Sequence, residues 1–442
     1  MKVVIIGGGL AGLSSAFHIE KFSGNKPVEI SILERNERLG GLASSSLHNG
    51  FTFDISGHLL HLHNPYTTKW ILNGLLKNNL CRHKRKSFIF NQKKFSKYPF
   101  QANLSELPGK TAAQCVAHFL KARDKFKEPS SNSSFAKWCV EVFGKGISKY
   151  FMNPYNRKLF CCDLNQMTAE WVKGFVPVPT REEVLYGAIK NQDKPLGYNA
   201  LFYYPRVGGI QSLPNAIAGR LKKSEIYPGH EALEIDAKKR TVHTPYASFK
   251  YDWLINTSPL PFFAKRFTSR TPSWFKRAST LPYAAVFNLN LGVNRGNITD
   301  KHWIYFPEPK FPFYRVGVAS NFTPKVAPTN ATSFYIEFAT RSPSRFDFNK
   351  NERAAIRKLE SIGLLKSSDR ILAKEWCGID PGYVIFTKTR QLIMPKVMNY
   401  LKANNILSIG RYGAWKYSFM EEALLEGKQA AETILKNARR KT

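Results

Sequence analysis

The segment at residues 2–12, KVVIIGGGLAG, constrains the fold more than any other part of the chain. An apolar strand runs into Gly7, Gly9 and Gly12 in a G-x-G-x-x-G frame, and helix-forming residues follow. The first glycine permits a tight turn, the second lets a pyrophosphate approach the backbone, and the third lets the helix pack against the strand. The helix N-terminus, with its partial positive charge, then faces the phosphates. The segment predicts a dinucleotide site built from a strand, a turn and a helix.

A second expected strand, at residues 28–33, ends in Glu34. A carboxylate at that place can accept hydrogen bonds from the ribose hydroxyls of an adenosine, whereas it would repel a 2′-phosphate. The loop that follows carries Arg35 and then the glycine pair Gly40 and Gly41. A second glycine loop of this kind is typical of flavin enzymes, in which an extended FAD passes both loops. The pair therefore favours FAD over NAD.

Three histidines follow in the segment FTFDISGHLLHLHNP. His58, His61 and His63 suggest a metal site by their number, but no cysteine or acid-rich segment lies near them. Their spacing fits an apolar strand or turn, so we expect no metal ion. We place His58, directly after Gly57, at the cofactor and interpret the other two as core or capping residues.

Length and composition exclude several classes of protein. With 442 residues the chain is long enough for two or three domains. It contains no run of about 18 apolar residues and no secretory signal segment, so we expect a cytoplasmic protein without an integral membrane segment. The cysteines lack the spacing of metal ligands and are expected to be reduced core thiols. They are Cys81, Cys115, Cys139, Cys161, Cys162 and Cys377.

The formal charge of +34 is the unusual quantity in the composition. It suggests a nucleic-acid partner, an anionic membrane face or an anionic ligand such as a nucleotide-sugar diphosphate. The basic residues, however, are spread along the chain and are only somewhat denser in residues 82–97 and 436–441. We interpret the excess as a lysine-rich composition and expect no nucleic-acid partner.

The periodicity of the chain predicts an α/β fold in three parts. A Rossmann-like FAD-binding domain is expected at residues 1–100, 200–262 and 395–442, because strands, glycine turns and helices recur in the second and third segments. Helical periodicity predicts an inserted helical domain at residues 101–199. Alternating apolar residues predict a mixed or antiparallel β-sheet at residues 263–394, which would line a substrate cleft.

Several of these segments resemble the flavin-dependent UDP-galactopyranose mutases, above all their eukaryotic branch, within the wider amine oxidase and protoporphyrinogen oxidase group. The resemblance runs nearly end to end, and its most specific stretches are WIYFPEPKFPFYR and GRYGAWKYS. The glycine motif adds little, because many flavoproteins share it. The segments that carry the resemblance are residues 40–44, 57–58, 98–101, 151–156, 197–199, 303–315, 382–383 and 410–417.

The resemblance implies flavin chemistry without net redox. In such enzymes N5 of the reduced flavin attacks the anomeric carbon of a nucleotide sugar, and the pyranose and furanose forms are interconverted for glycan biosynthesis, as with galactofuranose. The protein's share of this chemistry is positioning and charge stabilisation. The resemblance thus implies FAD that is active when reduced, a nucleotide-diphosphate sugar as substrate, and NAD(P)H or another reductant as a partner.

The resemblance also implies roles for single residues. Arg315 would hold the diphosphate by a charge-assisted fork, and His58 would contact the flavin. The implied catalytic residues are His58, Tyr305, Arg315, Tyr383 and Tyr417. The implied cofactor-binding residues are Gly7, Gly9, Gly12, Glu34, Arg35, Gly40, Gly41, Leu42, Gly57, His58, Arg411, Tyr417 and Ser418. The implied substrate-binding residues are Gln101, Asn156, Asn199, Trp303, Tyr305, Arg315, Tyr383 and Tyr417.

The chain departs from the family at one position. In that family a second arginine, after a tryptophan of the helical domain, grips the diphosphate from the opposite side. Here the stretch is WVKGFVP, and Phe175 occupies the counterpart position. An arginine that forms a bidentate fork is not replaced neutrally, so either Lys173 or Arg181 substitutes for it or the ligand differs. A deoxy-, amino- or heptose nucleotide sugar is compatible with this departure.

Two other functions stay open. A net oxidase or desaturase of the amine oxidase group, acting on an amine or an apolar substrate, would share the fold and the cofactor. A basic flavoprotein that binds nucleic acid or an anionic membrane, without catalysis, belongs to a different class. The sequence leaves the sugar, the nucleotide, the reductant and the oligomeric state open.

Overall fold

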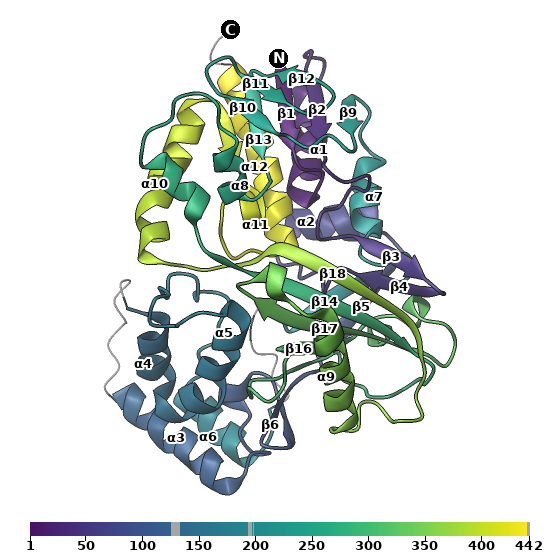
Figure 1. Cartoon of the computed structure of the whole chain (residues 1–442), viewed down its shortest axis with the longest axis vertical. Coiled ribbons are helices and arrows are strands. Elements are labelled where there is room, and N and C mark those ends of the chain that lie inside the picture. The colour runs from purple at the N-terminus through teal and green to yellow at the C-terminus, as the bar shows by residue number, and fades with distance from the viewer. Residues whose placement is uncertain (125–132, 193–196, 198, 440–442) are drawn as a thin grey trace.

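The computed structural model describes residues 1–124, 133–192, 197 and 199–439. Figure 1 shows three parts: a parallel sheet with helices at the top, a cluster of helices at the lower left and a large twisted sheet at the lower right. The amino terminus and the last helix, α12 (Met420–Arg439), both belong to the upper part. The α/β architecture that the periodicity predicted is confirmed.

The upper part is built on a parallel sheet of five strands. In spatial order these are β19 (Ile406–Ser408), β13 (Trp253–Asn256), β1 (Lys2–Ile6), β2 (Glu29–Leu33) and β9 (Ser224–Tyr227). Every neighbouring pair is parallel. The inner strands β13, β1 and β2 are almost entirely buried, as expected of a parallel sheet that helices cover on both faces. The strands predicted on both sides of the glycine motif are therefore confirmed.

The glycine motif lies where β1 ends and α1 (Leu10–Ser23) begins. Gly7 has a φ of +103°, a conformation that side chains rarely adopt. A Cβ atom on Gly12 would overlap the carbonyl oxygen of Gly7, so only glycine lets the helix start this close to the end of the strand. Farther along, α1 packs against α12, where Gly427 lies close to Ala11. Small residues thus set the spacing between strand and helices.

Four helices form the lower left part of Figure 1. They are α3 (Gly109–Asp124), α4 (Phe135–Ile147), α5 (Asn153–Phe160) and α6 (Arg181–Ile189). All four fall where helical periodicity predicted an inserted domain. The start of α6 is fixed by a capping box, in which Thr180 and Glu183 satisfy each other's free backbone N–H groups.

The lower right part is a mixed sheet of seven strands. In spatial order these are β18 (Ile371–Val384), β14 (Tyr283–Val293), β17 (Thr332–Thr340), β16 (Arg315–Val318), β15 (Trp303–Tyr305), β6 (Ser87–Asn91) and β7 (Lys94–Lys97). All pairs are antiparallel except β15 with β6, which is parallel. The helix α9 (Phe348–Glu360) lies over one face, and its buried Ala355 and Leu359 join the apolar cluster of this sheet. Strands β6 and β7 come from the chain before residue 100, so a segment outside the predicted sheet domain completes this sheet.

Among the described residues, the remaining strands form three smaller sheets, and the remaining α-helices flank the parts described above. The strands are β3 (Ser45–His48), β4 (Phe51–Asp54), β5 (Leu80–Lys84), β8 (Leu201–Pro205), β10 (Glu234–Asp236), β11 (Thr241–His243) and β12 (Ser248–Lys250). The helices are α2 (Pro65–Lys69), α7 (Ser212–Ala218), α8 (Leu260–Lys265), α10 (Lys388–Ala403) and α11 (Gly410–Gly413). The chain thus returns to the upper sheet through β9, β13 and β19, as a cofactor site built from distant segments requires.

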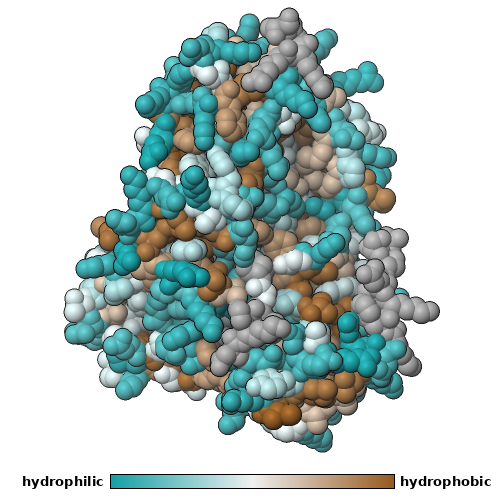
Figure 2. Space-filling view, turned by 180° about the vertical axis from the view of Figure 1, so that it is seen from behind, coloured by the Kyte–Doolittle hydropathy of each residue, from teal (hydrophilic) through white to brown (hydrophobic). Residues whose placement is uncertain are grey.

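The back of the molecule is neither uniformly hydrophilic nor uniformly hydrophobic. Figure 2 shows hydrophilic side chains scattered over the back of the molecule, with smaller hydrophobic patches between them. Within the part of the chain that the structure describes, no helix combines the length and apolar character of a membrane span, and no cluster of metal-ligating side chains occurs. All six cysteines are free, and burial raises the pKa of the Cys115 thiol to about 12.

The contact between α1 and α12 generates a stability prediction. A Cβ atom on Gly427 would lie 2.6 Å from the carbonyl oxygen of Ala11 and 2.7 Å from Cβ of Ser14. Alanine is the better helix former by about 1 kcal/mol, yet we expect Gly427→Ala to lower the thermal midpoint, because overpacking costs about 1–3 kcal/mol. Gly109→Ala is the matched control, since no atom lies within 4 Å of its Cβ position. Equal midpoints for the two variants would contradict the close helix packing.

Candidate functional site

A cavity of about 960 Å³ lies where the three parts of the molecule meet. Its wall contains the ends of β1 and β2, the helix α5 and the strands β15 and β16. Every residue that the sequence assigned to a site lines this cavity except Gly12, which lies behind the turn and spaces the helix. The lining residues among them are Gly7, Gly9, Glu34, Arg35, Gly40, Gly41, Leu42, Gly57, His58, Gln101, Asn156, Asn199, Trp303, Tyr305, Arg315, Tyr383, Arg411, Tyr417 and Ser418.

The two glycine loops lie side by side at one end of the cavity. Gly9 and Gly40 form a parallel bridge, and the N–H of Gly40 donates to the carbonyl oxygen of Gly8 at 2.9 Å. A Cβ atom on Gly9 would meet nothing closer than 3.8 Å, so this stretch of backbone faces open space. Because the two glycine loops present backbone without side chains, an extended, charged ligand can bind close to their backbone N–H groups.

Glu34 is fixed beside these loops. Its carboxylate accepts hydrogen bonds from the N–H of Gly8 at 2.7 Å and from the N–H of Asn36 at 3.0 Å. The side chain is 5% exposed and lines the cavity. A carboxylate has lone pairs for further donors, so Glu34 can still accept hydrogen bonds from ligand hydroxyls.

The loop that carries His58 is attached to the mixed sheet. Ser56 donates a hydrogen bond to the carboxylate of Glu337 on β17. A Cβ atom on Gly57 would overlap the ring of Tyr335, so the loop lies directly on that tyrosine. Nδ1 of His58 lies 2.7 Å from the carbonyl oxygen of Ile55. This carbonyl only accepts, so Nδ1 carries the proton.

Arg315 forms a fork with Glu337. The two residues face each other across β16 and β17, and both guanidinium nitrogens Nε and Nη2 donate to the carboxylate, the latter at 2.7 Å. Glu337 is fully buried, whereas the Arg315 side chain is 20% exposed on its cavity side. Burial opposes the charge of Arg315, but the Glu337 carboxylate outweighs it and raises the pKa of Arg315 well above its usual value. Arg315 therefore stays charged and is held at a fixed angle.

Tyrosines surround this arginine. The rings of Tyr383 and Tyr417 are stacked with centroids 6.2 Å apart, and Arg411 lies over the Tyr417 ring at 4.8 Å. Tyr305 contacts Tyr155 of α5 edge to face at 5.4 Å. Burial raises the pKa of Tyr383 and of Tyr417, so both phenols remain O–H donors at neutral pH. Arg411 also donates to the carbonyl oxygen of Ser418 at 3.0 Å, which orients it along the cavity.

Three residues of the cavity wall, Gln101, Trp171 and Trp303, carry a buried polar atom without a hydrogen-bond partner among the described residues. Nε1 of Trp303 and Oε1 of Gln101 are buried and have no hydrogen-bond partner within the described parts of the chain. Nε2 of Gln101 donates to the carbonyl oxygen of Pro177 at 2.6 Å, which fixes the amide. Buried polar atoms without a partner cost free energy.

Phe175 of the stretch WVKGFVP occupies part of the cavity wall. Its ring packs edge to face on Tyr417 with centroids 4.6 Å apart. Lys173 is exposed, and Arg181 lies at the surface, where it pairs with Asp124 at 2.7 Å. In this structure neither basic residue lines the cavity.

Sequence reasoning missed several residues of the site. Glu337 was not assigned, although a carboxylate within the apolar stretch SFYIEF is a signal that a buried partner exists. The aromatic residues Tyr98, Tyr155, Tyr314 and Tyr335 also line the cavity. Tyr98, Tyr155 and Tyr314 lie in segments that carry the resemblance, but their residue types are those of ordinary core residues, so they were not assigned to the site.

The buried histidine of this site generates a prediction about pH. Burial lowers the pKa of His58 from 6.5 to about 4, against the opposing hydrogen bond to the Ile55 carbonyl. Between these pH values the unfolded chain binds the proton and the folded chain does not, so stability is lost as the pH falls through this window. When the pH is lowered from about 7.5 to about 4.5, we expect the thermal midpoint of His58→Gln to fall by less than that of the parent. His63→Gln, at an exposed position of the same loop, should behave like the parent; identical pH profiles for all three proteins would contradict the buried neutral imidazole.

Comparisons with known proteins agree with this geometry. The chain matches the family model of the flavin containing amine oxidoreductases over residues 10–435. It is similar to a crystal structure of reduced UDP-galactopyranose mutase, with a TM-score of 0.91 and 26% identity over 98% of this chain and 95% of that chain. Cyclohexylamine oxidase from Brevibacterium oxydans IH-35A has a TM-score of 0.68 and 14% identity over 99% of each chain, which shows a common fold.

A curated relative covers only a short stretch. An uncharacterized protein of Methanothermococcus thermolithotrophicus is 36% identical over 73 residues, which are 16% of this chain and 67% of that protein. The match of the family model, by contrast, spans nearly the whole chain. The chain therefore belongs to the flavin containing amine oxidoreductase family, has the α/β fold of its members, and by this membership is an FAD-dependent enzyme.

Proposed function

We propose that this protein is an FAD-dependent nucleotide-sugar mutase that interconverts pyranose and furanose forms without net redox. The observation that carries the proposal is the single cavity, which has two glycine loops at one end and Arg315 among tyrosines at the other. The similarity to a reduced UDP-galactopyranose mutase over 98% of this chain supports the same reaction class.

The residues at the glycine end fit an FAD. The open space at Gly9 suits a pyrophosphate, and the fixed carboxylate of Glu34 suits the ribose hydroxyls. Arg35, Gly41 and Leu42 would border the same stretch, while His58, Arg411 and Ser418 would border the far end of the cofactor. Bound there in its reduced form, the flavin would supply a nucleophilic N5, and NAD(P)H or another donor would keep it reduced.

The residues at the other end fit the diphosphate and the sugar. Arg315 would present a cation to the diphosphate, and the phenols of Tyr305, Tyr383 and Tyr417, which line the same cavity, would donate hydrogen bonds to it. The donor Nε1 of Trp303 and the acceptor Oε1 of Gln101 would bond to the nucleotide sugar, with Asn156 and Asn199 beside them. These groups would hold the anomeric carbon before the flavin and stabilise the departing diphosphate.

The charge at this end bears on the choice of sugar. Glu337 neutralises part of the charge of Arg315, and Phe175 supplies an aromatic wall instead of a cation. A nucleotide sugar with a less polar sugar part, such as a deoxy sugar, suits such a wall as well as UDP-galactose does. The nucleotide-sugar class is therefore the proposal, and UDP-galactopyranose is its first test substrate.

A net oxidase of the amine oxidase group is the second candidate. The aromatic wall formed by Phe151, Tyr155 and Phe175 favours it, because amines with apolar bodies bind in such surroundings. The similarity of fold to cyclohexylamine oxidase is compatible with it. The fork of Arg315 favours an anionic ligand instead, since it would repel an ammonium group.

The proposed cofactor site predicts a separation of folding from flavin binding. A Cβ atom at position 9 would meet no protein atom closer than 3.8 Å, so Gly9→Val should fold. Its side chain, however, would occupy the space proposed for the pyrophosphate. We expect the purified variant to contain roughly tenfold less FAD by visible absorbance, with an unchanged circular dichroism spectrum. Gly109→Val, in open space away from the cavity, should keep its FAD. A Gly9→Val protein that contains as much FAD as the parent would refute the proposed position of the pyrophosphate.

Product analysis tests the proposed reaction. Protein reduced under argon is first screened by thermal shift with UDP-galactopyranose and with deoxy-, amino- and heptose nucleotide sugars. Sugars that raise the midpoint are then incubated and separated by chromatography. We expect at least one of them to yield an isomer of equal mass with a furanose ring. Oxidation of an amine, together with no isomer from any nucleotide sugar, would support the oxidase instead.

A further inference from the structure

Lys158 of α5 places its ammonium group among three backbone carbonyls. Nζ donates to the carbonyl oxygens of Phe306 at 2.6 Å, Glu308 at 2.7 Å and Phe313 at 3.1 Å. An ammonium group has three N–H donors, so each donor has one acceptor. All three acceptors belong to the connection between β15 and β16.

That connection joins the two strands that carry the proposed substrate residues. Phe306 directly follows Tyr305, and Phe313 lies two positions before Arg315. The two arms are also joined to each other, because the N–H of Phe306 donates to the carbonyl oxygen of Tyr314 at 2.9 Å. Lys158 therefore binds both arms of the hairpin at the point where Tyr305 and Arg315 turn toward the cavity.

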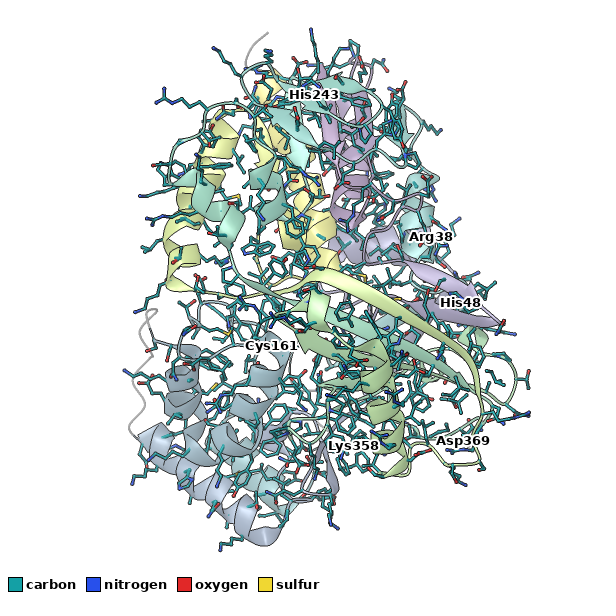
Figure 3. The ribbon with its side chains drawn as sticks, in the orientation of Figure 1. Arg38, His48, Cys161, His243, Lys358 and Asp369 are labelled. Atoms are coloured by element: carbon teal, nitrogen blue, oxygen red, sulfur yellow. The ribbon has the colours of Figure 1, made fainter. Side chains whose placement is uncertain are left out.

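The helix that carries Lys158 forms another part of the cavity wall. Tyr155 and Asn156 of α5 line the cavity, and Tyr155 touches Tyr305 edge to face at 5.4 Å. The helix ends before Cys161, which Figure 3 labels at the junction between the helical part and the mixed sheet. One side of α5 thus faces the ligand space, while Lys158 connects the helix to the opposite wall.

Packing alone does not require a charge at this position. Burial lowers the pKa of Lys158 from 10.5 to about 7, and the Glu308 carboxylate opposes this shift. The Glu308 carboxylate pairs with Lys310 at 3.0 Å, whereas Lys158 bonds to the backbone carbonyl of Glu308. A buried ammonium group is costly unless it is hydrogen-bonded, and an apolar side chain would fill the same space at no such cost. The directional bonds are what lysine adds.

We infer that Lys158 is a positioning residue, which locks the hairpin of Tyr305 and Arg315 against α5 and thereby sets the width of the nucleotide-diphosphate pocket. This inference rests on the proposed function for the identity of the ligand. It concerns the hairpin itself, however, so it can be tested even without turnover.

Lys158→Met keeps the length of the side chain and removes all three donors. We expect normal FAD content, roughly tenfold weaker binding of UDP and a similarly higher KM for UDP-galactopyranose, with kcat changed less than threefold. A loosened hairpin weakens ground-state and transition-state binding alike, which is why KM and not kcat carries the effect. Arg157→Met, at the neighbouring exposed position of α5, is the control and should match the parent in both constants.

Amide hydrogen exchange measures directly how well the backbone of the hairpin is protected. The backbone N–H of Tyr314 donates to the backbone carbonyl oxygen of Glu337, and that of Phe311 donates to the backbone carbonyl oxygen of Glu308. Both amides are therefore protected from exchange in the parent. We expect faster exchange in residues 306–314 of Lys158→Met and not of Arg157→Met, with or without UDP. If the parent fails to bind any nucleotide sugar, the proposed function falls, and this exchange measurement still decides the role of Lys158.

A second variant covers the case in which Lys158→Met does not fold. Lys158→Gln retains an amide with two N–H donors and should show an intermediate KM and intermediate exchange. Parent-like UDP affinity and parent-like exchange in whichever variant folds would overturn the inference. Slow exchange with a large loss of kcat would also overturn it, because the residue would then act on the chemistry and not on the hairpin.

Discussion

The buried carboxylate of Glu337 is the interaction on which the arrangement of this site depends. A carboxylate without exposure to water must be paired and hydrogen-bonded, and here Arg315 supplies the pairing from the adjacent strand while Ser56 supplies a hydroxyl. These two partners come from different parts of the molecule: Arg315 from the mixed sheet and Ser56 from the loop that leads to His58. One buried charge thus fixes the arginine at the proposed substrate end and also attaches the histidine loop to the same sheet. Loss of Arg315 would leave the charge unpaired, and loss of Ser56 would remove one of its hydrogen bonds.

The glycine end of the site could be predicted from sequence because its causes are local. Gly7 adopts a positive φ, and Gly12 lets the helix approach the strand within a few residues of chain. The position of Glu34 at the end of the next strand follows from the same βαβ unit, and its carboxylate lies where the spacing predicted. The convergence of Trp303, Tyr305 and Arg315 on one cavity needed a hairpin between two short strands, and β15 and β16 form it. The roles of these residues toward ligands remain predictions.

The rest of the site depends on contacts between distant segments, which sequence patterns do not encode. Glu337 lies in an apolar strand, and only the register of β16 against β17 brings it opposite Arg315. In the sequence, Lys158 is indistinguishable from any other basic residue of a helix. In the fold, three backbone carbonyls of another segment surround its ammonium group. Lys173 was one of two candidates for the place of the family's second arginine, but the fold leaves its side chain exposed. In each case the decisive partner is more than twenty residues away or on another element, so neither periodicity nor motif spacing could reveal it.

The central claim of the proposed function is that the flavin acts in isomerisation and is not consumed as a redox agent. The most direct test is the rate of UDP-galactopyranose isomerisation under argon, measured while dithionite titrates the flavin from oxidised to reduced, with oxygen uptake recorded in parallel aerobic samples. The account predicts that the rate rises in proportion to the reduced fraction, with no reductant consumed per turnover and no oxygen uptake linked to product. Turnover by the oxidised flavin with one oxygen consumed for each product would contradict it.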